Sequence, residues 1–109
     1  MIRKDMVRTS TPTHIFTVKH DEGSLTDILK GLLITYKQGN NIVLEKRMED
    51  VTIDGDTIRV KLTQEETKKF KAGQVVLVQV RSLLITGDSI PSPIFHIDVG
   101  DVLNDEVML

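Results

Sequence analysis

Two of the three histidines have carboxylates close by in the chain, and this combination is the one best suited to metal binding. His96 and Asp98 lie two positions apart in a run that alternates apolar and polar residues, so both side chains would share one strand face. With one further ligand they could hold a metal ion. Two solvated side chains on an exposed strand explain this pair more simply, and a polar loop explains His20 beside Asp21 and Glu22. We therefore expect no metal site.

Two further acidic groups suggest chemistry, and in both the local structure is a sufficient reason for the residues. The triplet Asp54-Gly55-Asp56 is similar to part of a calcium loop, but the spaced ligands and closing Glu of that loop are missing. It stands between two alternating runs, where glycine supplies the positive φ that a tight hairpin needs. Glu65 and Glu66 could form an acid–base pair. At the start of a short helix they would instead face the positive end of the helix dipole.

The patterns that mark known catalytic machinery are missing from the sequence. No serine lies in a G-x-S-x-G turn, and no glycine-rich phosphate loop occurs. The absence of cysteine excludes disulfides, thiolate zinc sites and a cysteine nucleophile. We expect a protein that is not an enzyme, with no catalytic residue and no cofactor, and we do not expect a small-molecule ligand.

The charge balance gives no bulk attraction to nucleic acid or to an anionic membrane, because 14 basic residues face 16 acidic ones and the net charge is −2. The basic side chains that could gather have no interleaved aromatic residues on which bases would stack. These are Arg59, Lys61, Lys68, Lys69, Lys71 and Arg81. No apolar run approaches the roughly 20 residues that cross a bilayer, and no signal peptide is recognisable. We expect a soluble protein made in the cytoplasm, with neither nucleic acid nor membrane as a partner.

The elements that would position these residues are mostly strands. With no Trp, one Tyr and three Phe, the core must be built mainly from Val, Ile and Leu, and the β-branched ones favour strands. Alternation and turn signals predict strands at 14–19, 32–37, 42–46, 51–53, 57–62, 74–81 and 94–99. Short strands joined by tight turns predict one all-β domain, an antiparallel β-sandwich of about seven strands with one or two helical turns.

The two helical turns have recognisable ends. Ser24 is a suitable N-cap for a turn over residues 24–30, and Gly31 would stop it. Thr63 and Glu66 have the spacing of a capping box, which predicts a helix over residues 63–70. Phe70 would close that helix against the edge of the sandwich.

Residues 74–81 form the strongest predicted strand and supply the candidate functional surface. Val76, Val78 and Val80 would share one face of this strand. The opposite face would carry Val75, Leu77, Gln79 and Arg81, the candidate association surface. If Val75 and Leu77 are exposed, they offer an apolar patch to a partner. If residues 25–30 or the C-terminal tail cover them, they belong to the core, and the sequence leaves both alternatives open.

The chain divides into three parts by composition. Residues 1–12 are expected to be a flexible N-terminal lead-in, and residues 13–99 the sandwich domain. Residues 100–109 are acidic but contain Val102, Leu103, Val107 and Leu109. This tail would form a terminal strand or dock on another surface.

A pattern of turns and strands over residues 13–99 is similar to that of a known group of proteins. The segments that carry it are Tyr36-Lys37-Gln38-Gly39, Val43-Leu44-Glu45-Lys46, Asp54-Gly55-Asp56, Leu62 to Thr67 with Phe70 and Ala72-Gly73, Val78-Gln79-Val80-Arg81, Gly87 and Ser92-Pro93-Ile94. Together they resemble small proteins encoded in phages and prophages of Firmicutes. Those proteins are similar to the immunoglobulin-like N-terminal domain of phage baseplate upper proteins. The resemblance implies an immunoglobulin-like sandwich in which residues 62–73 cross between sheets, and a virion-associated, protein-binding role.

Three functional hypotheses follow. The leading one is a non-enzymatic phage or prophage structural or adapter protein that associates with other phage structural proteins or with itself. The alternative is a carbohydrate-binding module on the same fold. Such a module needs exposed aromatic rings that stack on sugars, and this sequence offers few of them, because Tyr36 is the only tyrosine and there is no tryptophan. A small hydrolase would need a pocket that joins His14 or His96 to carboxylates.

Overall fold

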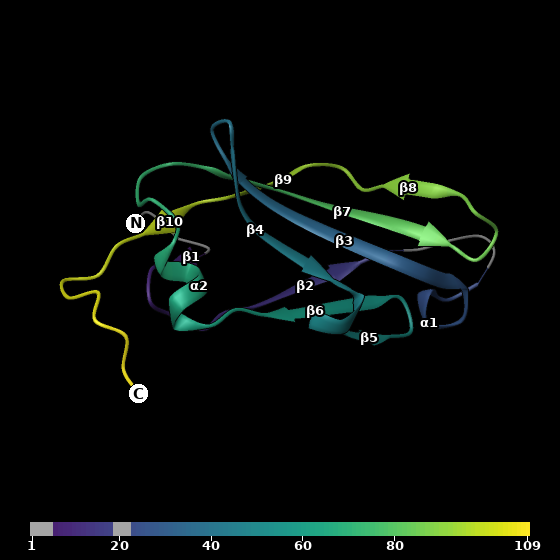
Figure 1. Ribbon diagram of the computed structural model, residues 1–109, viewed down its shortest axis with the longest axis horizontal. Helices are drawn as coiled ribbons and strands as arrows, with labels where there is room; N and C mark the ends of the chain where they lie inside the picture. Colours follow the sequence, from purple (N-terminus) through teal and green to yellow (C-terminus); the bar gives the residue numbers. More distant parts are fainter. Residues whose placement is uncertain (1–5, 19–22) are drawn as a thin grey trace.

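Two sheets packed face to face make up most of the protein, whose computed structural model describes residues 6–18 and 23–109 (Figure 1). The smaller sheet has the order β2 (Thr13–Thr17), β6 (Thr57–Lys61) and β5 (Thr52–Asp54). The larger sheet has the order β4 (Asn41–Arg47), β3 (Leu29–Gln38), β7 (Val76–Leu84) and β8 (Ser89–Pro91), and β9 (Phe95–Ile97) also pairs with β7. Both sheets are antiparallel, and the predicted all-β sandwich is confirmed.

The strand order is that of an immunoglobulin-like sandwich. In that fold strands B, E and D share one sheet, and strands C′, C, F and G share the other. Here β2, β6 and β5 take the first set of places, and β4, β3, β7 and β9 take the second. The chain passes from β6 to β7, and so from one sheet to the other, through residues 62–75, which include the segment 62–73 that the resemblance implies as the crossover.

The core lies between the two inner faces. The predicted face of Val76, Val78 and Val80 is confirmed, because all three are buried on β7. Ile34 and Tyr36 of β3 lie in the neighbouring rows and are fully buried. The smaller sheet contributes Ile58, Val60 and Phe16, and the following loop contributes Leu62. Each such side chain contributes about 1.5–3 kcal/mol by leaving water.

Two tight hairpins are built on glycine. Asp54 pairs with Thr57, so the loop between β5 and β6 is Gly55-Asp56, with Gly55 at φ +59°. A positive φ at the first loop position alone is the pattern of a type II′ turn, whose twist matches that of the strands. Gly39, at φ +57°, has the same place between β3 and β4. The predicted hairpin at Asp54-Gly55-Asp56 is therefore confirmed.

The helices are short connectors: α1 (Leu25–Ile28), α2 (Gln64–Lys68) and a 3-10 turn, η1 (Met48–Asp50). The predicted capping box is present at α2, where Glu66 N–H donates to Thr63 Oγ1 (3.2 Å) and Thr63 N–H donates to Glu66 Oε1 (2.9 Å). Phe70 is 1% exposed, and its ring meets the Tyr36 ring edge-on at 6.0 Å. Phe70 thus closes the crossover against the core, as expected.

Three predicted boundaries are wrong. Gly31 does not stop a helix: α1 ends at Ile28 and the chain enters β3 at once, with Gly31 paired to Leu83. The strand at 74–81 is displaced to Val76–Leu84, because pairing with β3 continues to Leu84. The last predicted strand is interrupted at Asp98. Residues 95–97 pair with β7, whereas β10 (Val99–Gly100) pairs with residues 6–7. In each case pairing with a distant strand decides the boundary.

Segments near the two ends of the described chain lie beside α2. β1 (Met6–Val7) pairs in parallel with β10, and Met6 is 1% exposed, although the sequence assigns it to the lead-in. Arg8 donates to Asp101 (3.0 Å) and Asp105 (3.2 Å) of the tail. The tail then runs beyond the sandwich (Figure 1) and contacts α2, where Gln64 Nε2 donates to the carbonyl of Met108 and the N–H of Met108 donates to Gln64 Oε1 (2.9 Å each). Among the described residues, no helix has the length and apolar character needed to span a membrane.

Candidate association surface

The outer face of the larger sheet carries three of the four predicted site residues. Leu77, Gln79 and Arg81 alternate with the buried valines of β7, and their side chains point away from the core. Each lies beside a residue of β3: Leu77 pairs with Lys37, Gln79 with Thr35 and Arg81 with Leu33. Val75 is 45% exposed but precedes β7. The β3 and β7 residues form one continuous surface, which we call the outer sheet face.

Two adjoining depressions hollow this outer sheet face. One, of about 420 Å³, is lined by Leu33, Thr35 and Lys37 of β3, Leu77, Gln79 and Arg81 of β7, and Ile42 and Ile94 at its margins. The other, of about 450 Å³, lies towards the N-terminal end of β3, and its lining includes Lys30, Arg47, Met48 and Leu83. Leu33 and Arg81 line both depressions. These two residues are therefore the centre of the surface.

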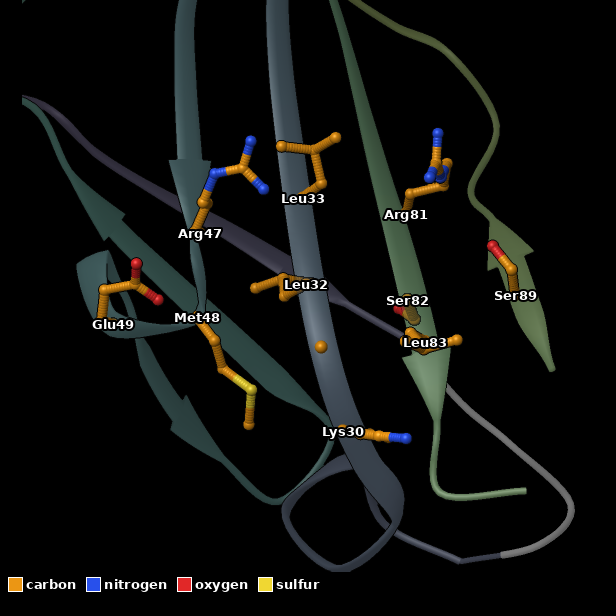
Figure 2. A pocket seen from close by; sticks show the side chains of 11 residues that line it. Lys30, Leu32, Leu33, Arg47, Met48, Glu49, Arg81, Ser82, Leu83 and Ser89 are labelled. Carbon is orange, nitrogen blue, oxygen red and sulfur yellow. The ribbon is translucent and has the colours of Figure 1, made fainter. Parts of the chain in front are cut away.

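Leu33 lies between two guanidinium groups. It pairs with Arg47 on β4 and with Arg81 on β7, and Figure 2 shows the two arginines on either side of it. Its side chain is half-buried, whereas both arginines are exposed. Arg47 Nη2 lies 3.5 Å from Glu45 Oε2, but both side chains are exposed and such a pair contributes little. Both arginines are thus accessible to a partner.

The charge of this surface is mainly positive. Lys30, Lys37, Arg47 and Arg81 line the two depressions, while Glu49 is the one acidic residue in either lining. An apolar centre rimmed by cations is complementary to an acidic partner with an apolar side chain at its middle. The exposed guanidinium groups can bind carboxylates in bidentate geometry.

The loop before β9 is fixed to this face by polar contacts. Gln79 Nε2 donates to the carbonyl of Ser92 (2.9 Å), and the N–H of Val80 donates to Ser92 Oγ (3.0 Å). Ile94, two residues further on, is 54% exposed at the margin of the depression. Gln79 therefore acts as a structural anchor for this margin.

The described histidines and acidic pairs do not come together into a metal centre. Within residues 6–18 and 23–109, no group of three or more His, Asp or Glu side chains could hold an ion. His96 and Asp98 are exposed. The predicted loop cluster His20, Asp21 and Glu22 lies outside the described residues. Asp56 accepts a hydrogen bond from the N–H of Leu25 (3.3 Å), so its carboxylate connects the hairpin to α1.

Tyr36 is unavailable as a sugar-stacking platform because it is completely buried. Its hydroxyl lies 2.7 Å from Nδ1 of His14, and the two rings stack at 5.6 Å. Burial, with the negative charge of Glu66, raises the pKa of Tyr36 far above its ordinary value. Tyr36 and His14 therefore form a polar contact within the core.

Sequence reasoning missed the β3 and β4 half of the surface. Leu33 lies in a run of apolar residues, LLIT, that gives no sign of which side chain faces outward. The bulge between Leu29 and Gly31 fixes this orientation, because it shifts the register with β7. Comparisons of the chain with protein-family models, with curated proteins and with solved structures found no match.

Proposed function

We propose that this chain is a non-enzymatic structural or adapter module that binds a partner protein through the outer sheet face. The observation that carries this proposal is the pair of adjoining depressions centred on Leu33 and Arg81. Both lie on a paired sheet, so the backbone from which their side chains project is already ordered by the pairing of β3 and β7. Rigid surfaces of this kind lose little conformational entropy on binding.

The partner that fits this surface is an acidic protein segment with an apolar anchor. Arg47 and Arg81 would bind its carboxylates while Leu33 contacts the anchor. The resemblance described above adds a setting, the virion of a phage or an induced prophage. In that setting the partner is another structural protein of the particle.

The carbohydrate-binding alternative has no observation in its favour, because Tyr36 is inside the core. The aromatic ring with substantial exposure is Phe95, at 41%, and it packs against Phe16 with ring centroids 5.6 Å apart. A single tilted phenyl ring gives no platform for a pyranose face.

The proposal is tested by particle association. The gene is expressed with a detectable tag during prophage induction, and particles are purified by density gradient. We expect the wild-type chain to sediment with particles, and the double variant Leu33→Thr with Arg81→Glu to be lost from them. Arg59→Glu is the matched control, because Arg59 is an exposed arginine on the outer face of the smaller sheet.

Two results would contradict the proposal. One is a wild-type chain that never sediments with particles. The other is a double variant that stays bound as well as the control. Circular dichroism of each purified variant shows whether the sandwich is intact, so that misfolding is not mistaken for lost binding.

A further inference from the structure

β2 is an edge strand whose hydrogen-bonding pattern can be read residue by residue. The N–H of Val18 donates to the carbonyl of Asp56 (2.9 Å), towards β6. At the other end, the N–H of Leu62 donates to the carbonyl of Pro12 (3.0 Å). Residues of an antiparallel strand turn their N–H and C=O groups alternately to one side and the other. The even-numbered residues of β2 therefore bond to β6, and the odd-numbered ones face away.

Thr13, Ile15 and Thr17 thus present their N–H and C=O groups to the outer edge of the smaller sheet. Among the described strands, β6 is the one that pairs with β2. In the immunoglobulin-like order this outer place belongs to strand A, which precedes strand B in the chain. Within the described residues β1 is the strand before β2, and it pairs with β10 instead.

The space beside this edge is open. A depression of about 610 Å³ lies between β2 and β9 and is lined by Ile15, Phe16 and Phe95 among others. Ile15 is 59% exposed, and Phe95 is 41% exposed. An edge strand with exposed apolar side chains is a template for pairing with another strand.

The other sheet edges carry features that discourage such pairing. β4 ends in Glu45-Lys46-Arg47, and β8 contains Pro91. β5 and β9 have three residues each, and β5 ends in Asp54. Charges, proline and short length are the usual protections of an edge. β2 has the sequence Thr-His-Ile-Phe-Thr, which contains no Asp, Glu, Lys or Arg and no proline.

We propose that two copies of this chain pair through β2, antiparallel, about a two-fold axis at Ile15. This register places Ile15 opposite Ile15 of the second copy and Thr13 opposite Thr17. Every outward N–H of one β2 then meets an outward C=O of the other. Shifting the register by two residues in either direction leaves some of these groups unpaired. A two-fold axis requires a self-complementary patch, and β2 is one.

The side chains around β2 are compatible with this pairing. Arg59 lies beside Ile15 on β6, and Lys61 lies beside Thr13. In the dimer the two β2 strands lie between the two copies of Arg59, so three strand spacings, or about 14 Å, separate the Arg59 residues. That separation exceeds the Debye length of about 8 Å at physiological salt, so their repulsion is largely screened. The apposed threonines and isoleucines are uncharged and have high β-propensity.

The test is sedimentation velocity of the purified chain from micromolar to millimolar concentration. We expect a monomer–dimer equilibrium for the wild-type chain. Ile15→Lys should lower the association constant by at least about tenfold, because it places two ammonium groups directly opposite each other. Ile85→Lys is the matched control, since Ile85 is 63% exposed just after β7 and lies outside both proposed surfaces, and this variant should associate like the wild type.

A cross-linking experiment checks the register. The chain has no cysteine, so one introduced thiol reports one contact. Directly opposed residues in a hydrogen-bonded antiparallel pair have Cα atoms about 5.5 Å apart, within the range that a disulfide spans. Under mild oxidation Ile15→Cys should form a covalent dimer, and Ile85→Cys should form far less.

Three results would overturn the proposal. They are a wild-type chain that stays monomeric at every concentration, equal weakening of the dimer by Ile15→Lys and Ile85→Lys, and equal cross-linking of the two cysteine variants. The β2 edge and the outer sheet face are separate surfaces, so the two proposals can fail independently. The Leu33→Thr and Arg81→Glu double variant should lose particle binding and keep the dimer, whereas Ile15→Lys should lose the dimer.

Discussion

Replacing Glu66 with Gln is expected to lower the free energy of unfolding by about 1 kcal/mol at neutral pH. The carboxylate of Glu66 is 18% exposed and forms an ion pair with Nζ of Lys46, which is 12% exposed. Its other oxygen accepts the N–H of Thr63 (2.9 Å). The amide of Gln keeps an acceptor for Thr63 and removes the charge. The loss is therefore that of a partly buried ion pair between α2 and β4.

A larger truncation separates the two roles of this side chain. Glu66→Ala removes the ion pair and the hydrogen bond of the capping box, so we expect a loss of about 2 kcal/mol. The difference between the Ala and Gln variants measures the capping contact. A double-mutant cycle with Lys46→Met then isolates the coupling energy between the two charged side chains.

The pH dependence gives an independent check. Burial raises the pKa of the Glu66 carboxyl, but hydrogen bonds from Lys46 and Thr63 and the charge of Lys46 outweigh it, so the pKa is below its usual value. A depressed pKa contributes stability that is present above the unfolded value and lost as pH falls through the folded one. The unfolded value of Glu is about 4.3. The difference between wild type and Glu66→Gln should therefore be full near neutral pH and shrink in more acidic solution.

The assay is urea unfolding followed by circular dichroism, because the chain has no tryptophan. With a urea m-value of about 1–1.5 kcal/mol/M for a domain of this size, the Gln variant should unfold at a midpoint roughly 0.7–1 M lower. Glu65→Gln is the control, since Glu65 is exposed in the same helical turn. Equal midpoints for the two Gln variants, or a difference that persists unchanged in acid, would refute the reasoning.

Three further substitutions test the core and the turns. Tyr36→Phe removes the buried hydrogen bond to His14 (2.7 Å) and should lower stability by about 1–2 kcal/mol in thermal unfolding; an unchanged melting temperature contradicts this. Gly55→Ala should lower the free energy of unfolding by about 1 kcal/mol, because a side chain is strained at φ +59° even though no atom lies within 4 Å of the added Cβ. The expected sign is faster amide hydrogen exchange in this hairpin than in the wild-type hairpin, and an unchanged exchange rate there would contradict the prediction. Gln38 is 5% exposed and both donates to and accepts from the backbone of Lys71 (2.9 Å each), so Gln38→Ala should cost about 2–3 kcal/mol in urea unfolding, and a loss under 1 kcal/mol would contradict that role.

Features that depend on neighbouring residues could be predicted from the sequence. The capping box of Thr63 and Glu66 and the hairpin at Gly55 need a few consecutive residues, and both are present. The two faces of β7 follow from simple alternation: Val76, Val78 and Val80 lie on one face, and Leu77, Gln79 and Arg81 lie on the other. Period-2 patterning gives the faces without any knowledge of the partner strand.

Features that depend on pairing between distant segments came only from the tertiary structure. Gly31 reads locally as a helix stop, but pairing with Leu83 makes it part of β3. Tyr36 lies in the predicted strand at 32–37, whose local pattern does not show whether the ring is buried; in the fold it contacts His14 and Phe70 and is completely buried.

The two surfaces proposed here show the same division. The sequence by itself determined that Leu77, Gln79 and Arg81 face away from the valines of β7. The register of β3 decided that Leu33 lies between two arginines, and the strand order decided that β2 is an edge. Local patterns fix which face of a strand is apolar, because side chains alternate. Which strands become neighbours depends on contacts across many tens of residues, and these form only when the whole sandwich closes.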